Sequence, residues 1–143
     1  MRLLPLKQDN VRSALLSNRK RVFVVDDSPG VLRAMERLLQ QHGYDTVLFG
    51  SAEAFEKHTC FKEVLCVLLD INLDSGRSGI QLRHRLKEKG HAVPVIYMTA
   101  NDNPVVHKAA LESGCLAYFV KPVSARSLIG QLERASHFGQ ATI

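Results

Sequence analysis

The sequence lacks the features that mark secreted, membrane-spanning or zinc-binding proteins. Its three cysteines (Cys60, Cys66 and Cys115) are odd in number and show no C-x-x-C spacing, so they predict reduced thiols in or near the core, not a disulfide framework or a zinc site. No apolar run approaches the roughly 18 residues that span a bilayer. Residues 1–20 lack the apolar segment and cleavage site of a signal peptide. These absences favour a cytoplasmic protein.

Motifs for nucleotide binding are also missing. The chain contains neither GxxxxGK[ST] nor GxGxxG, which argues against a P-loop or Rossmann enzyme. Its six histidines show no spacing typical of metal ligands. Other side chains are therefore expected to carry the chemistry.

The positive charge of the chain is confined to one end. Residues 1–21 hold six basic side chains and one acid, so they account for the whole formal net charge of +5 of the 143-residue chain. No aromatic residue accompanies them, so we expect residues 1–20 to form a solvated extension and not a nucleic-acid-binding arm. A single domain over residues 21–137 and a tail over 138–143 complete the predicted organisation.

The most informative stretch is an apolar run from Val64 to Leu69 that ends in a carboxylate, Asp70. A short unbroken run with β-branched residues is typical of a strand buried on both faces of a parallel sheet. Residues 22–27 repeat the pattern and end in Asp26 and Asp27. One aspartate after a strand can simply start a turn, so the interpretation of Asp70 depends on what ends the other strands.

Helical patterns alternate with further strands. Ser28 and Pro29 predict a helix start, because they supply an N-cap and a proline at the first helical position. Further strands are expected at residues 44–49, 93–98 and 116–120, with helices beginning after Ser51, near Gly79, after Asn103 and after Ser124. This alternation predicts an α/β fold: a flavodoxin-like, doubly wound (βα)5 arrangement with a parallel five-stranded sheet in the order 2-1-3-4-5.

Residues that end parallel strands gather at one edge of the sheet. Here they are Asp26, Asp27, Asp70, Thr99 and Lys121. Three clustered acids repel one another, and Mg²⁺ is a hard cation that prefers such oxygen ligands. The Thr99 hydroxyl and the Lys121 ammonium group suit a phosphoryl group. Together they predict phosphoryl transfer in which a carboxylate acts as the nucleophile and forms an aspartyl phosphate.

Each of these residues also has an ordinary structural interpretation. Asp26 and Asp27 could be acids at a helix N-terminus, where the helix dipole favours them. Thr99 could be a plain strand residue and Lys121 a surface lysine. Tyr118, in the strand expected just before Lys121, could likewise be an ordinary core aromatic. The functional interpretation rests on their occurrence together.

Four fragments, in this order, resemble the receiver domain of two-component response regulators. They are Val25-Asp26-Asp27, Leu69-Asp70, Met98-Thr99-Ala100 and Tyr118-Phe119-Val120-Lys121-Pro122. The resemblance covers about residues 21–137. It implies that Asp70 accepts a phosphoryl group from a phosphohistidine on a sensor histidine kinase or a histidine phosphotransfer protein.

The resemblance also implies roles for the surrounding residues. Mg²⁺ would be held by Asp26, Asp27, Asp70 and the backbone carbonyl of Asn72. Thr99 would move to bond the phosphoryl group, and Lys121 would pair with it. Tyr118 corresponds to the family's switch aromatic, which turns inward when the threonine moves. The bond before Pro122 is usually cis in this family.

The implied function is a phosphorylation switch. We expect a stand-alone receiver that acts in the cytoplasm through protein contacts and catalyses only its own phosphorylation and dephosphorylation. Residues 103–137 are the expected contact face for a downstream protein, and a second copy of the chain is a further candidate partner. Neither nucleic acid nor a membrane is an expected partner.

The loop after Asp70 departs from the usual pattern of the family. Leu73-Asp74 stands where many members have Met-Pro, and Gly79 lies one residue farther from the aspartate than is commonest. Asp74 adds an acid near the site, and Arg77 is expected to offset its charge.

Two other functions stay open as alternatives. A receiver-like binding module that is never phosphorylated would be expected to lack one of the acids, the threonine or the lysine, and none is missing. A Mg²⁺-dependent aspartyl phosphatase of the haloacid dehalogenase type would need a second aspartate two residues after the nucleophile, where this chain has Asn72. The receiver is the preferred interpretation.

Overall fold

A computed structural model of the chain describes residues 20–58 and 60–141. The predicted N-terminal extension therefore lies, except for Lys20, outside the described residues. Among the helices that are described, none combines the length and the hydrophobicity that crossing a bilayer requires.

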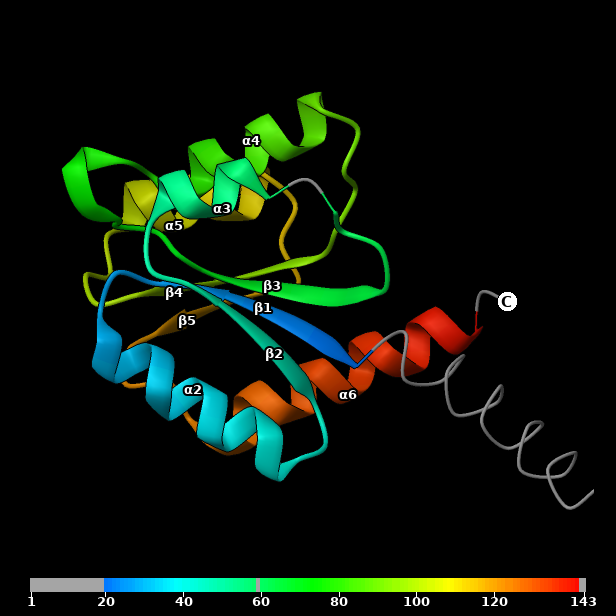
Figure 1. The fold of residues 1–143 in the computed structure, drawn as a ribbon. Helices are drawn as coiled ribbons and strands as arrows, with labels where there is room; N and C mark the ends of the chain where they lie inside the picture. The colour runs from blue at the N-terminus through cyan, green and yellow to red at the C-terminus, as the bar shows by residue number, and fades with distance from the viewer. Residues whose placement is uncertain (1–19, 59, 142–143) are drawn as a thin grey trace, which may run out of the picture.

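In the described part of the chain, five parallel strands form one sheet in the order β2-β1-β3-β4-β5 (Figure 1). They are β1 (Arg21–Val25), β2 (Asp45–Phe49), β3 (Val64–Asp70), β4 (Val95–Thr99) and β5 (Ala117–Val120). The predicted flavodoxin-like topology is confirmed. With this order the carboxyl ends of β1, β3, β4 and β5 are neighbours.

Helices cover both faces of the sheet. They are α2 (Pro29–Gln41), α3 (Ala52–Lys57), α4 (Gly79–Glu88), α5 (Pro104–Glu112) and α6 (Ala125–Ala141). Figure 1 shows α2 and α6 on one face and α3, α4 and α5 on the other. A short 3₁₀ helix, η1 (Asp74–Gly76), lies in the loop after β3.

The core consists of two apolar clusters, one on each face of the sheet. Successive strand residues point to opposite faces, so Leu68 packs into one cluster and Leu69 into the other. Both side chains are fully buried, which confirms that the apolar run of β3 is a strand covered on both sides. This rigid centre fixes where Asp70 emerges.

The predicted helix starts are also confirmed. The side chain of Ser28 accepts a hydrogen bond from the backbone N–H of Val31 at 3.3 Å, and Asn103 caps α5 by accepting from Val105 at 2.8 Å. Such caps satisfy backbone donors that have no partner inside the helix. The cap on α2 fixes the chain direction directly after Asp26 and Asp27.

Two expectations need correction. The last helix continues to Ala141, so residues 138–141 are helical and are not part of a tail. Gly139 lies within this helix, and a glycine costs a helix only about 1 kcal/mol when it keeps helical dihedral angles. Of the three cysteines, Cys66 is buried and Cys115 half-buried, but Cys60 is exposed; all are free thiols.

Candidate functional site

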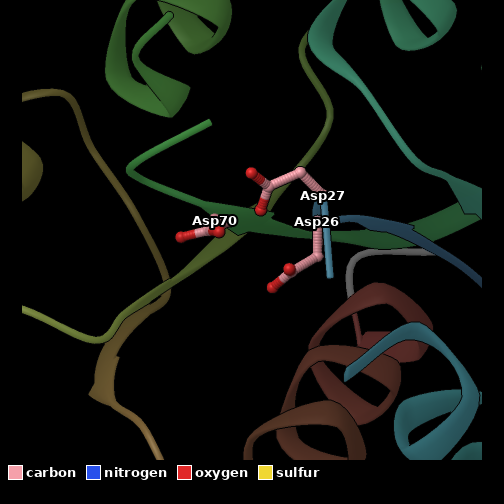
Figure 2. A group of neighbouring side chains, drawn as sticks. All are labelled: Asp26, Asp27 and Asp70. Carbon is pink, nitrogen blue, oxygen red and sulfur yellow. The ribbon is translucent and has the colours of Figure 1, made fainter. Parts of the chain in front are cut away.

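Three carboxylates meet at the carboxyl edge of the sheet. Asp26 and Asp27 follow β1, and Asp70 is the last residue of the neighbouring strand β3. One oxygen from each lies within 4.8 Å of the others, and Figure 2 shows the three side chains gathered at these strand ends. Such a set of oxygen donors fits a hard divalent cation. The edge could therefore hold a metal ion.

Lys121 links two of these acids. The Asp26 side chain is fully buried, and its Oδ2 accepts a hydrogen bond from Lys121 Nζ at 2.7 Å. The same ammonium group lies 3.3 Å from Asp70 Oδ2. Burial by itself lowers the pKa of Lys121, but the two carboxylates outweigh it and raise the pKa above its ordinary value. Lys121 is therefore a positive charge fixed beside the phosphoacceptor candidate.

Asp70 is an unusually basic carboxylate. Its residue is 4% exposed. Burial, followed by the charge of Asp26, raises the pKa of Asp70 to about 6, while Lys121 and the backbone N–H of Asn72 act in the opposite direction. The carboxylate is thus mostly ionised at neutral pH and a better nucleophile than an exposed aspartate.

The loop after β3 brings Asp74 to the site. The Asp74 carboxyl group, together with burial, raises the pKa of Asp27, so Asp74 lies close to Asp27. The expectation that Asp74 adds an acid here is confirmed. The expectation that Arg77 offsets it is wrong, because the guanidinium group of Arg77 pairs with Glu56 of α3.

Asn72 connects the acceptor to Thr99. Its backbone N–H donates to Asp70 Oδ1 at 3.2 Å, and its side-chain amide donates to Thr99 Oγ1 at 3.4 Å. The buried Thr99 hydroxyl also accepts from the backbone N–H of Asn101 at 3.1 Å. The side-chain link was missed from the sequence, although an asparagine two residues after a strand-ending aspartate is a typical turn residue. The metal-ligand role of the Asn72 carbonyl stays a prediction.

Tyr118 contacts α5 and the loop that precedes this helix. Its ring stacks on His107 of α5, with 4.1 Å between ring centroids and 7° between planes. Its hydroxyl donates to Asp102 Oδ1 at 3.1 Å, and the residue is half-buried. No sequence pattern indicated the contacts of Tyr118 with His107 or Asp102. The predicted site residues at the strand ends therefore come together, whereas Tyr118 contacts the helix that follows β4. The Lys121–Pro122 bond is cis, as the resemblance implied.

Gly79 allows α4 to approach the acceptor closely. A Cβ atom at this position would lie 2.3 Å from the backbone carbonyl oxygen of Asp70 and 3.0 Å from Leu69 Cγ. The backbone N–H of Gly79 donates to the Ile71 carbonyl at 2.8 Å, which holds the two segments together. The sequence marked Gly79 only by its spacing from Asp70 and not by this contact.

We expect Gly79→Ala to lower the free energy of unfolding by about 1–3 kcal/mol, because an extra methyl group overpacks against backbone that cannot turn away. Urea unfolding measures the effect. Gly130→Ala is the matched control: Gly130 lies within α6 and has nothing within 4 Å of an added Cβ. That control should gain about 0.5–1 kcal/mol. Equal stability of Gly79→Ala and the wild type would contradict the close approach.

The raised pKa of Asp70 predicts a pH dependence of stability in the absence of divalent cations. The folded chain keeps this proton up to a pKa of about 6, whereas the unfolded chain loses it near 3.8. Between these values the folded state binds more protons, so the free energy of unfolding should fall as the pH rises, by up to about 1.4 kcal/mol per pH unit. Urea unfolding from pH 4 to 7 tests this. A slope unchanged in Asp70→Asn would show that another group causes it.

The comparisons with known proteins agree with this geometry. Residues 22–133 match the model of a protein family described as the response regulator receiver domain. A receiver domain protein (CheY-like) from Methanospirillum hungatei JF-1 has the same fold, with a TM-score of 0.78 and 22% identity over 87% of this chain and 98% of that one.

Two curated relatives carry regulatory names. The transcriptional regulatory protein AruR of Pseudomonas aeruginosa is 33% identical in an alignment of 118 residues that covers 78% of this chain and 47% of AruR. The response regulator protein TodT of Pseudomonas putida is 26% identical over 114 residues, 80% of this chain and 50% of TodT. The chain thus spans about half the length of these relatives. Given the family match over most of its length, the chain belongs to the receiver domain family of response regulators.

Proposed function

We propose that the chain is a phosphorylation switch in two-component signalling and that Asp70 is its phosphoacceptor. The donor would be a phosphohistidine on a sensor histidine kinase or a histidine phosphotransfer protein. The observation that carries the proposal is the Asp70 carboxylate at the edge of the sheet, with Lys121 Nζ 3.3 Å away and two further acids in one cluster. The cytoplasm is the proposed location.

In the proposed reaction, an Asp70 carboxylate oxygen attacks the phosphorus atom of the phosphohistidine. The new P–O bond forms as the P–N bond breaks, and the leaving imidazole nitrogen keeps the electron pair of that bond. Mg²⁺ bound by the three acids would neutralise charge on the transferred phosphoryl group. Lys121 would exchange part of its contact with Asp70 for a phosphoryl oxygen. The chain would turn over no separate substrate, only acquire and lose this group.

The switch would pass from Thr99 to Tyr118. Within the described residues, the hydrogen bonds of the Thr99 hydroxyl are long, at 3.1–3.4 Å, so a charged phosphoryl oxygen is a stronger partner. We propose that its movement releases Tyr118 from Asp102 and His107. Residues 103–137 would then change their shape for a downstream protein or a second copy, and Val105 there is 77% exposed.

Beryllofluoride, which imitates an aspartyl phosphate, tests this proposal. With Mg²⁺ present, we expect NMR signals of the Thr99 amide and the Tyr118 ring to shift on addition of beryllofluoride. Tyr44, buried beside α2 and on the other face of the sheet, should give an unchanged ring signal. Binding without a change at Tyr118 would contradict the switch. No binding at all would indicate a receiver-like module that works without phosphorylation.

A further inference from the structure

The loop between β3 and α4 is a closed unit. Its outgoing and returning legs are joined where the backbone N–H of Leu73 donates to the Arg77 carbonyl at 3.0 Å. Further links are the antiparallel bridge between Asn72 and Ser78 and the hydrogen bond from Gly79 N–H to the Ile71 carbonyl. Because the two legs are hydrogen-bonded to each other, a displacement of Arg77 would also displace Leu73 and its neighbour Asn72.

Glu56, a residue of α3, forms an ion pair with this loop. One of its carboxylate oxygens pairs with the guanidinium group of Arg77, and the other lies 2.8 Å from Arg85 Nε on α4. The side chains are partly shielded, with exposures of 24% for Glu56, 37% for Arg77 and 38% for Arg85. Of these two arginines, only Arg77 belongs to the loop.

Two residues of the same loop, Asn72 and Asp74, lie at the acidic cluster. Asn72 donates to Asp70 Oδ1 and to Thr99 Oγ1, and Asp74 is close enough to Asp27 to raise the pKa of that carboxyl group. The backbone N–H of Arg77 in turn donates to the Asp74 carbonyl at 3.3 Å. A chain of contacts therefore runs from Glu56 through Arg77 to both ends of the acidic cluster.

We propose that the Glu56–Arg77 ion pair is a positioning device for the phosphoacceptor site. Glu56 and Arg77 touch none of the reacting atoms; they hold the loop so that Asn72 and Asp74 face the metal-binding acids. This inference rests on the proposed function, because its consequence for the site is a change in Mg²⁺ affinity. The ordinary alternative is a surface ion pair with no effect on the site.

Two single substitutions separate these alternatives. Arg77→Gln and Arg85→Gln remove the same charge and the same kind of contact with Glu56, but only the first frees the loop. Loss of a positive charge near three acids should by itself strengthen cation binding slightly. We therefore expect Arg85→Gln to leave Mg²⁺ affinity unchanged or slightly higher, and Arg77→Gln to weaken it about threefold, within the range of partly exposed ion pairs. Calorimetric titration with Mg²⁺ measures both.

A second readout needs no metal. Hydrogen exchange of the Leu73 amide, which donates to the Arg77 carbonyl, should be faster in Arg77→Gln and in Glu56→Gln but not in Arg85→Gln. Exchange of the Leu73 amide in the double variant Glu56→Gln/Arg77→Gln should be no faster than in either single variant. The reason is that all three variants lose the same Glu56–Arg77 ion pair. Equal Mg²⁺ affinities for the two arginine variants, or unchanged exchange at Leu73, would overturn the positioning role. A wild-type chain that bound no Mg²⁺ would instead overturn the proposed function, and Leu73 exchange would still decide whether the ion pair holds the loop.

Discussion

Asp70→Asn should reduce Mg²⁺-dependent phosphoryl incorporation from acetyl phosphate to background, since an amide oxygen is not a usable nucleophile. The same variant should be more stable than the wild type at pH 7 without metal. The wild-type chain must keep Asp70 ionised in a buried site where its pKa is about 6 instead of 3.8, and the neutral amide avoids that cost of about 3 kcal/mol. Intact mass and urea unfolding measure the two effects.

Asp45→Asn is the control for this pair of results. Asp45 is exposed and begins β2, at the opposite edge of the same sheet. Its replacement should leave phosphoryl incorporation unchanged and should change the free energy of unfolding by no more than about 0.5 kcal/mol. Incorporation that persists in Asp70→Asn would mean that another residue accepts the group. An unfolded Asp70→Asn variant would mean that Asp70 supports the core and not a site at its rim.

Among single substitutions of the site residues, Lys121→Met should cause the largest loss of stability. It leaves Asp26, which is fully buried, and Asp70 without their shared cation. Removing one partner of a buried ion pair is strongly destabilising because the other charge stays unpaired. We expect a loss of about 2–4 kcal/mol at pH 7 without metal, part of which Mg²⁺ should restore by replacing the missing positive charge. Phosphorylation should also slow, since the phosphoryl group loses its ammonium partner.

Lys108→Met serves as the control for Lys121→Met, because Lys108 is an exposed lysine on α5. Thermal unfolding with and without Mg²⁺ compares the two variants and the wild type. Mg²⁺ should raise the melting temperature of Lys121→Met more than that of Lys108→Met. Equal stability of the two variants without metal would contradict the view that Lys121 compensates the buried acids.

The sequence was sufficient for the fold and for the members of the acidic site. Val64 to Asp70 and residues 22–27 share a pattern that only a doubly covered strand explains well, and the structure has both strands side by side. Because parallel strands end at one edge, the residues that close them had to meet there. Asp26, Asp70 and Lys121 are within bonding distance for that reason.

The sequence was insufficient where the partner depends on how a loop or side chain turns. Arg77 was expected to offset Asp74, three positions before it, yet it pairs with Glu56 on a separate helix. Proximity along the chain favoured Asp74, but the direction of the Arg77 side chain follows from how the loop closes. The stacking of Tyr118 on His107 likewise requires the packing of α5 against β5, which no periodicity reports.

The role of Asp70 as the phosphoacceptor is tested by locating the phosphoryl group on the chain. The wild-type chain is incubated with acetyl phosphate in Mg²⁺ or in EDTA, reduced with borohydride, digested and analysed by mass spectrometry. Borohydride converts an aspartyl phosphate to homoserine, so we expect homoserine at position 70 in Mg²⁺ and intact aspartate there in EDTA. Homoserine at another acid, or an unmodified chain in Mg²⁺, would contradict Asp70 as the phosphoacceptor.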